Sequence, residues 1–345
     1  TSCAQAIGPL PRLQGDPVTS AMLSILAAAA LVAGAAAALP EAYPTIPMRG
    51  VAGDMRMPLI GLGTWQYDGP KARQAVAAAL GLGYRHVDTA LVYENQAGVG
   101  EALGASGLGR EEYFVTSKIP GGLNASATAA AADQCLAELK LGHVDLMLIH
   151  FPSSFDAGGP GGAALRKEEW LALEKWAKSG KARAIGVSHY CKSQLDDVLS
   201  VATVPVALNQ VEYHIGMGSA PDDATDYKSY CQSKGVVYMS FSTLCGPCPA
   251  PGNTTLLTGD LATGIGRAHN KTGAQVALRW AVQQGIPVVP KSAVPRHIKE
   301  DFELFDFELT GEEMAELSAA KEPAVAGGGD GLVSGDCAVE RELVV

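Results

Sequence analysis

The chain has 345 residues, of which 47% are hydrophobic and 18% are charged, a composition typical of a globular protein with a large core. The net charge of -10 argues against general nucleic-acid binding, which requires a basic surface. Seven mostly dispersed cysteines lack paired metal-ligand spacing, so we expect reduced thiols, no disulfide framework and no metal site.

The first segment with a clear pattern is an uncharged, alanine-dominated run over residues 21–39. Ala36 and Ala38, ahead of Pro40, resemble the small-residue exit of a signal peptide. The run approaches the length of a membrane span but is only weakly hydrophobic. We interpret residues 1–42 as a leader, favouring a targeting segment over a disordered leader or a membrane anchor. Localisation stays open between the cytoplasm, the secretory pathway and an organelle.

Apolar segments then alternate with helical patterns. Strands are predicted at residues 58–63, 84–87, 113–117, 145–149, 183–187, 206–211, 236–241 and 287–289. Helices are predicted at 71–82, 95–103, 127–141, 167–178, 193–199, 226–234 and 273–284. Strands that are apolar throughout, with helices between them, indicate a parallel sheet covered on both faces.

Eight such units over about 250 residues favour a single closed (β/α)₈ TIM barrel over an open sheet. A doubly wound sheet would require a glycine-rich fingerprint after its first strand, and residues 61–66 lack the third glycine. We assign the barrel to residues 43–322 after a short lead-in, and a flexible tail to residues 323–345. The long glycine- and proline-rich connection over residues 243–256 is predicted to cover a ligand.

Polar groups stand where successive predicted strands end. They are Asp88, Lys118, His150, Ser188, His189, Gln210, Lys291 and Ser292. In a (β/α)₈ barrel, residues just past the carboxyl ends of the strands form the active site. One shared site is therefore expected.

Three segments resemble the signatures of the aldo-keto reductases. They are residues 83–90 followed by Tyr93, residues 146–152 around His150, and residues 289–292. They occur in the family's order and spacing, and the resemblance covers about residues 46–317. It implies reduction of a small-molecule carbonyl by hydride from a nicotinamide cofactor.

The resemblance implies a catalytic group of four residues. Tyr93 would protonate the carbonyl oxygen, and Lys118 would lower the tyrosine pKa by roughly 2 to 3 units from its ordinary value near ~10. Asp88 would keep Lys118 charged, and His150 would orient the carbonyl. Taken one at a time, these residues also suit a helix cap, a core aromatic, a solvated strand end and a core histidine.

The same resemblance places the nicotinamide end of the cofactor. Ser188, His189 and Gln210 would hold the carboxamide, and Phe241 would stack on the ring. The family usually has Asn at position 189 and often Tyr at position 241. Imidazole can still donate one hydrogen bond, and Phe keeps the aromatic face.

Further contacts along the cofactor follow from the resemblance. Ser242 and Leu244 would lie along the pyrophosphate, and Thr64 and Trp65 near the nicotinamide ribose. Trp65 and Phe151 would border the substrate, with Phe151 standing where many relatives have Trp. An apolar-walled substrate pocket is therefore expected.

The adenosine end is implied by four residues and one departure. Lys291 and Ser292 match contacts to the adenosine 2′-phosphate, and Glu300 and Asp301 match the adenine-binding pair. His297 replaces the family's usual Arg, while Arg296 lies beside it. We expect NADPH as the cofactor, with NAD possible and the preference narrower than in relatives that have the Arg.

Two rival functions remain open from the sequence. A cofactor-binding regulatory protein could use the same fold, and Cys245 and Cys248 form a motif that also appears in thiol-disulfide oxidoreductases. The cysteine pair lacks the thioredoxin context and suits a loop thiol pair or a local disulfide. The chain is otherwise expected to be monomeric, without nucleic-acid partners or stable membrane insertion.

Overall fold

The computed structural model describes residues 43–154, 161–217, 224–244 and 255–320. The predicted leader, the tail from residue 323, and Cys245 with Cys248 lie outside these residues and stay predictions. Within them, no helix has both the length and the apolarity needed to cross a membrane.

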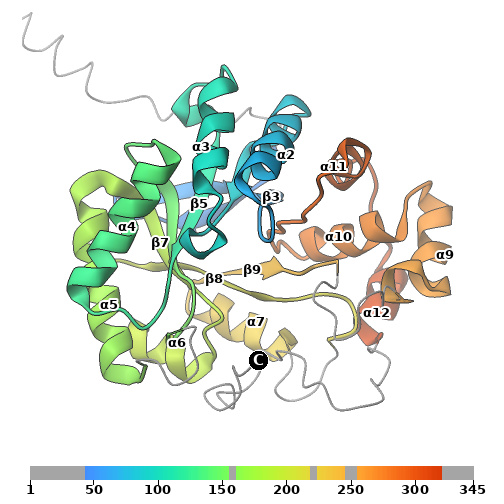
Figure 1. Cartoon of the computed structure of the whole chain (residues 1–345). Helices are drawn as coiled ribbons and strands as arrows, with labels where there is room; N and C mark the ends of the chain where they lie inside the picture. The colour runs from blue at the N-terminus through green and yellow to red at the C-terminus, as the bar shows by residue number, and fades with distance from the viewer. Residues whose placement is uncertain (1–42, 155–160, 218–223, 245–254, 321–345) are drawn as a thin grey trace, which may run out of the picture. The chain divides into compact units, whose positions relative to one another are not determined.

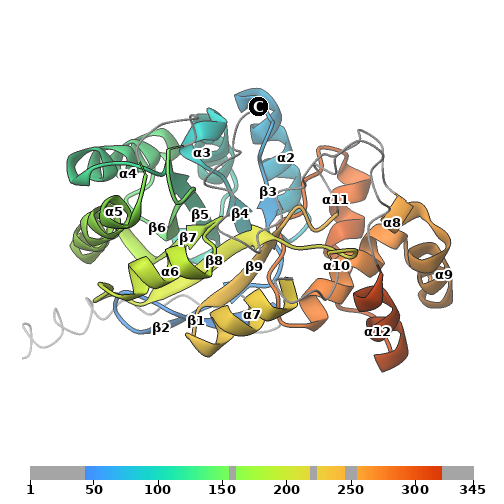
Figure 2. The same cartoon turned by 90° about the horizontal axis from the view of Figure 1, so that it is seen from below.

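An antiparallel hairpin precedes the barrel, formed by β1 (Thr45–Arg49) and β2 (Asp54–Pro58). Its buried methionines, Met48, Met55 and Met57, pack into the apolar interior of the barrel. The turn is joined to the start of a barrel strand, since Val51 N donates to Arg183 O at 2.8 Å. The hairpin thus closes the amino-terminal end of the barrel, where β1 and β2 lie in Figure 2. The sequence pattern predicts only a short lead-in at these residues.

Seven parallel strands form one sheet in chain order. They are β3 (Leu62–Gly63), β4 (His86–Asp88), β5 (Phe114–Ile119), β6 (Val144–Ile149), β7 (Ala182–Ser188), β8 (Val206–Glu212) and β9 (Val237–Phe241). The predicted eighth strand is reduced to single bridges from Val288 to Ile60 and to Ser240. These bridges join the two edges of the sheet, so the predicted (β/α)₈ barrel is confirmed although its last strand is shorter than expected.

Helices surround the sheet, as Figure 1 shows. They are α2 (Gly69–Gly81), α3 (Gln96–Ala105), α4 (Ala125–Leu139), α5 (Ala163–Trp176), α6 (Lys192–Leu199), α7 (Ala224–Ser233), α8 (Thr255–Thr258), α9 (Asp260–His269), α10 (Gly273–Gln283), α11 (Pro295–Phe302) and α12 (Gly311–Ala319). Asp68, Asn124, Thr272 and Thr310 cap four of them by accepting a backbone N–H of the first turn. The sequence pattern does not predict α8, α9, α11 and α12.

A buried ion network fastens the amino-terminal end of the barrel. The Asp145 carboxylate is fully buried and accepts from Arg110 Nη2 at 2.6 Å, Arg183 Nη1 at 2.8 Å and Val115 N at 2.8 Å. One carboxylate therefore joins β5, β6 and β7. A buried charge is tolerated because all of these donors converge on it.

Asp145→Ala is expected to lower the free energy of unfolding by about 2 to 4 kcal/mol, because it leaves two guanidinium groups and a backbone N–H without their acceptor. Urea unfolding followed by circular dichroism measures the change. Glu101→Ala is the matched control, since its ion pair with Arg73 is 3.8 Å long and exposed. A loss below 1 kcal/mol for both variants would contradict the structural role of Asp145.

Candidate active site

A buried ion pair lies at the carboxyl end of the barrel. The Lys118 ammonium contacts the Asp88 carboxylate, and both side chains are almost completely buried. Lys118 Nζ also donates to Thr89 O at 3.0 Å and to Tyr93 Oη at 3.4 Å. The predicted acid, lysine and aspartate thus form one connected group.

Tyr93 and His150 complete this group. Tyr93 ends η1 (Leu91–Tyr93), a single 3₁₀ turn that closes at Glu94 in the left-handed region with φ 54°. The Tyr93 and His150 rings meet edge to face with centroids 5.6 Å apart. His150 follows β6, whose alternate residues Leu146 and Leu148 face the barrel interior. All four predicted catalytic residues are therefore brought together.

The tyrosine pKa differs from the sequence-based expectation. Burial raises the pKa of Tyr93 above its ordinary value, while Lys118 acts to lower it and Asp88 acts to raise it. The predicted net lowering is wrong for this structure, because Asp88 offsets much of the lysine charge and burial disfavours the phenolate. Burial, followed by Lys118, holds the pKa of His150 well below its ordinary value, so its imidazole is neutral. Tyr93 is consequently a protonated donor near neutral pH.

Gln210 makes a contact that sequence analysis did not anticipate. Its Nε2 donates to Asp88 Oδ2 at 2.8 Å, on the carboxylate oxygen not used by Lys118. The two residues come from β8 and β4, on different sides of the barrel. The only sequence signal was that both stand at inward-facing strand ends. Gln210 therefore borders the catalytic group as well as the predicted carboxamide site.

Asn95 is a second residue that sequence analysis missed. It is fully buried, and its Nδ2 donates to Thr64 O at 2.8 Å and to Tyr67 O at 2.9 Å. Its Oδ1 accepts from Thr89 Oγ1 at 3.1 Å. The amide thus anchors the loop after β3, which carries Thr64 and Trp65. A polar residue directly after the Tyr93 turn was the available signal.

Aromatic rings form a continuous row beside the catalytic group. Phe151 stacks on His150 with centroids 4.4 Å apart and on His189 at 4.5 Å, and His189 contacts Phe241 at 4.7 Å. Trp65 is 42% exposed, with Lys291 Nζ over its ring. The row connects Phe151, a predicted substrate wall, to Phe241, the predicted support for the nicotinamide.

The predicted carboxamide residues also gather here. Ser188 ends β7 and pairs with Gln210 on β8, and His189 directly follows the strand. Ser188 Oγ donates to Gln210 O at 2.8 Å and lies 3.0 Å from His189 Nδ1. Ser242 and Leu244 follow β9 in the described residues, with Ser242 in the left-handed region at φ 53°.

The predicted adenosine residues lie apart from the catalytic group, after the Val288 bridges and on α11. Lys291 Nζ donates to Gln66 Oε1 at 2.7 Å and lies 5.6 Å from the Trp65 ring centroid. Arg296 Nη2 lies 3.2 Å from His297 Nε2, so the guanidinium borders the position where the family's usual Arg is missing. Ser292 directly follows Lys291.

Asp301 is buried and makes no ion pair with any described residue. Burial, followed by the charge of Glu300, raises its pKa to about 7. A buried carboxylate without a cation is unfavourable on its own, which suits a group that accepts from a ligand.

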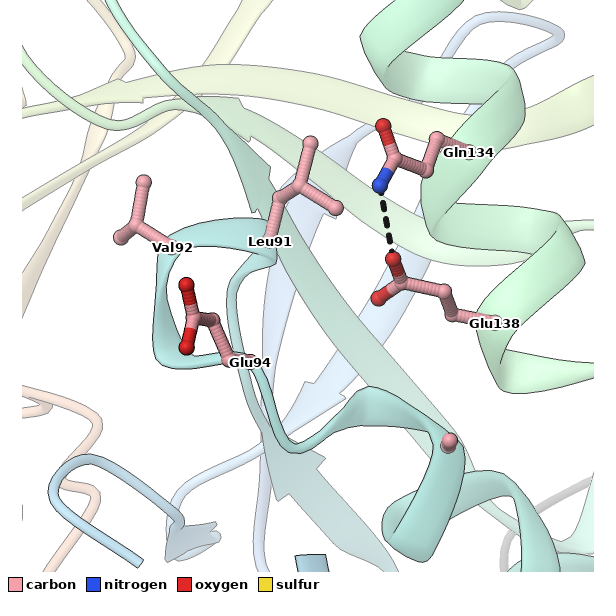
Figure 3. A pocket seen from close by; sticks show the side chains of 6 residues that line it. Leu91, Val92, Glu94, Gln134 and Glu138 are labelled. Carbon is pink, nitrogen blue, oxygen red and sulfur yellow. Dashed lines mark hydrogen bonds between the residues drawn. The ribbon is translucent and has the colours of Figure 1, made fainter. Parts of the chain in front are cut away.

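A hollow of about 450 Å³ lies outside this site, between η1 and α4 (Figure 3). It is lined by Leu91, Val92, Glu94, Ala97, Gln134 and Glu138. None of these is a predicted site residue. The Gln134 amide donates to Glu138 at 2.8 Å on its wall, so this hollow is a separate surface feature next to the Tyr93 turn.

The described cysteines are Cys135 and Cys231, which are buried free thiols, and Cys191, which is disulfide-bonded. Cys191 is an exception to the expectation of reduced thiols. Among the described residues, no cluster of three or more His, Cys, Asp or Glu side chains could hold a metal ion.

Comparison with known proteins gives the family. The model of the aldo/keto reductase family matches residues 59–322. The chain belongs to this family. It is 38% identical over 279 residues to an aldo-keto reductase family 1 member A1-A of Danio rerio, covering 75% of this chain and 85% of the relative. It is 37% identical over 267 residues to a glyoxal reductase of Bacillus subtilis (strain 168), covering 77% and 89%. This aldo-keto reductase is accordingly an oxidoreductase acting on carbonyl groups.

Solved structures agree with this assignment. An aldo-keto reductase enzyme from a Medee basin deep-sea metagenome library has a TM-score of 0.72 and 32% identity, covering 81% of this chain and 95% of that one. The aldose reductase of Schistosoma japonicum has a TM-score of 0.70 and 32% identity, covering 81% and 94%. The predicted family resemblance is confirmed.

Asp301→Asn is expected to stabilise this aldo-keto reductase at pH 8 and to leave its stability unchanged at pH 4. In the folded state the pKa of Asp301 is about 7, above the ordinary value of 3.8. The free energy of unfolding of the native protein therefore falls as pH rises between these two values. Asn removes that loss, with a gain of about 1 to 3 kcal/mol at pH 8 after allowance for relaxation.

Urea unfolding at both pH values measures the gain. Glu312→Gln, on the exposed side of α12, controls for removal of one negative charge. An equal gain at pH 4 and pH 8 would show that ionisation of Asp301 is not the cause.

Proposed function

We propose that the protein reduces an aldehyde or ketone to an alcohol, with NADPH as the hydride donor and Tyr93 as the proton donor. The observation that carries the proposal is the buried Lys118–Asp88 pair with Tyr93 Oη 3.4 Å from the ammonium and the His150 ring beside it. A buried lysine is held charged here because Asp88 and Thr89 O accept from it.

The residues suit a carbonyl whose oxygen gains negative charge. Bound NADPH would supply hydride to the carbonyl carbon. Tyr93 would give the oxygen its proton, and the nearby ammonium would stabilise the phenolate left behind. His150 would donate from Nε2 to the same oxygen. That tautomer leaves a lone pair, not an N–H, at the buried Nδ1, which has no hydrogen-bond partner among the described residues.

The proposed cofactor residues fit a dinucleotide in character and position. Polar groups at Ser188, His189 and Gln210 lie beside the catalytic group, the cation Lys291 follows the Val288 bridges, and the buried Asp301 lies on α11. Trp65 and Phe151 would flank the substrate, in an apolar setting suited to an aldehyde or ketone. The protein is proposed to act as a monomer.

Tyr93→Phe is expected to reduce carbonyl reduction by at least about 1,000-fold, because the substitution removes the donated proton and keeps the ring. Cofactor affinity should change by less than about threefold. NADPH oxidation with a panel of aldehydes, together with calorimetric titration of NADP⁺, measures both quantities.

Activity retained at the wild-type level in this variant would exclude the role of Tyr93. Binding of NADPH by the wild-type chain without turnover of any aldehyde or ketone would favour the regulatory alternative. Val92→Ala, an exposed neighbour in the same turn, is the matched control for disturbance of η1.

We also propose that NADPH is preferred over NADH, with Lys291, Ser292 and Arg296 contacting the 2′-phosphate. His297→Arg is expected to raise catalytic efficiency with NADPH about 5- to 10-fold, because a guanidinium fork binds a phosphate dianion through paired donors. Arg296→Ala should lower it by a similar factor, and neither change should affect NADH. Equal catalytic efficiency with the two cofactors in the wild-type chain would refute the preference.

A further inference from the structure

The residue types of the proposed carboxamide site suggest that it can both donate and accept hydrogen bonds. The contacts its side chains make in the structure leave a narrower choice. The site consists of Ser188, His189 and Gln210, at the ends of β7 and β8. A carboxamide has both a donor, its NH₂, and an acceptor, its carbonyl oxygen. The groups that the site has left to offer therefore decide which half of the carboxamide it can recognise.

His189 offers an acceptor. Its Nδ1 lies 3.0 Å from His150 O, a carbonyl that can only accept, so Nδ1 carries the ring proton. Burial lowers the pKa of His189 to about 4, so the ring has a single proton near neutral pH. Nε2 then carries no proton, so it can only accept, and it makes no hydrogen bond with any described residue.

Gln210 also offers an acceptor. Its amide nitrogen must face Asp88 Oδ2, at 2.8 Å, because an ionised carboxylate accepts and does not donate. The same nitrogen lies 3.4 Å from Met239 Sδ, a weak acceptor that takes the second N–H. The amide oxygen, Oε1, is the end left over, again without a hydrogen bond within the described part of the chain.

Ser188 completes the pattern. Its single hydroxyl proton goes to Gln210 O at 2.8 Å, so its oxygen accepts from His189 Nδ1 at 3.0 Å. None of the three side chains keeps a free donor. An Asn at position 189, which the resemblance gives as usual for the family, would contribute an NH₂ group at this position.

We propose that this aldo-keto reductase recognises the nicotinamide carboxamide through its NH₂ group alone, with His189 Nε2 and Gln210 Oε1 as the acceptors. The inference rests on the proposed nicotinamide-dependent function and deepens it. His189 becomes a residue that determines cofactor-analogue specificity. Its backbone, at φ 62°, lies in the left-handed region, where His and Asn are among the more readily tolerated residues.

The test compares three oxidised cofactors that carry the same ring charge and phosphates. They are NADP⁺, its thionicotinamide analogue, which keeps the NH₂ group, and its 3-acetylpyridine analogue, which has no N–H. Isothermal titration calorimetry with the wild-type chain should give dissociation constants within about threefold for the first two. The acetylpyridine analogue should bind at least about 10-fold more weakly, since two acceptors lose their donor.

His189→Asn tests the assignment to this residue. The new amide can turn its NH₂ toward the acetyl oxygen, so the penalty on the acetylpyridine analogue should fall by at least about fivefold. Leu171→Ala, at an exposed position on α5, is the control, because it leaves every group of the carboxamide site untouched. Its analogue ratio should equal that of the wild-type chain.

The outcomes separate the inference from the proposed function. Equal binding of NADP⁺ and the acetylpyridine analogue, with carbonyl reduction intact, overturns the inference alone. Weaker binding of the thionicotinamide analogue than of the acetylpyridine analogue also overturns it, because the carbonyl would then be the recognised half. Failure of all three cofactors to bind overturns the proposed function and the inference together.

Discussion

The ion pair between Lys118 and Asp88 is the constraint on which the active site depends. An ammonium in the interior of a barrel is stable only when a carboxylate and further acceptors surround it. β4 and β5 pair in parallel with Asp88 opposite Thr116, which brings Lys118, two residues farther along β5, onto the same inward face. The pair is completed by neutral partners: Tyr93 Oη and Thr89 O accept from Lys118, and Gln210 Nε2 donates to Asp88.

The barrel could be predicted from the sequence because its strands are apolar throughout and its helices intervene at regular distances. The β1–β2 hairpin was missed because its buried residues are only Met48, Met55, Met57 and Pro58, and charged residues such as Arg49, Asp54 and Arg56 stand next to them. The last strand was overestimated, since the apolar run around Val288 suggests a full strand while bridges form only at Val288. Pro287 and Pro290 have no N–H to donate, and their carbonyls only accept from Ser240 N and Gly63 N. The pattern of apolar residues in a segment does not determine how many backbone bridges it forms with neighbouring strands.

The candidate catalytic residues followed from the resemblance to the aldo-keto reductase signatures, and the structure brings them together. Their ionisation did not follow, because the tyrosine pKa reflects the balance among burial, Lys118 and Asp88, and only geometry sets that balance. The sequence likewise does not tell whether His189 and Gln210 have a donor or an acceptor left for a ligand. That is determined by a third partner, the His150 carbonyl for one and the Asp88 carboxylate for the other. A residue type gives the capacity to donate or accept, and its neighbours decide which capacity is used.

The hairpin closes the end of the barrel opposite to the one that carries the candidate active site. The described chain begins at Tyr43 and enters through β1, beside the starts of β7 and β9, while Tyr93 and His150 stand at the opposite ends of the strands. Substitutions in the hairpin, or in its contacts with the starts of β7 and β9, therefore fall on the side of the barrel away from the candidate active site. The packing of the barrel floor and the polar groups at its mouth are thus independent of one another in sequence and in position.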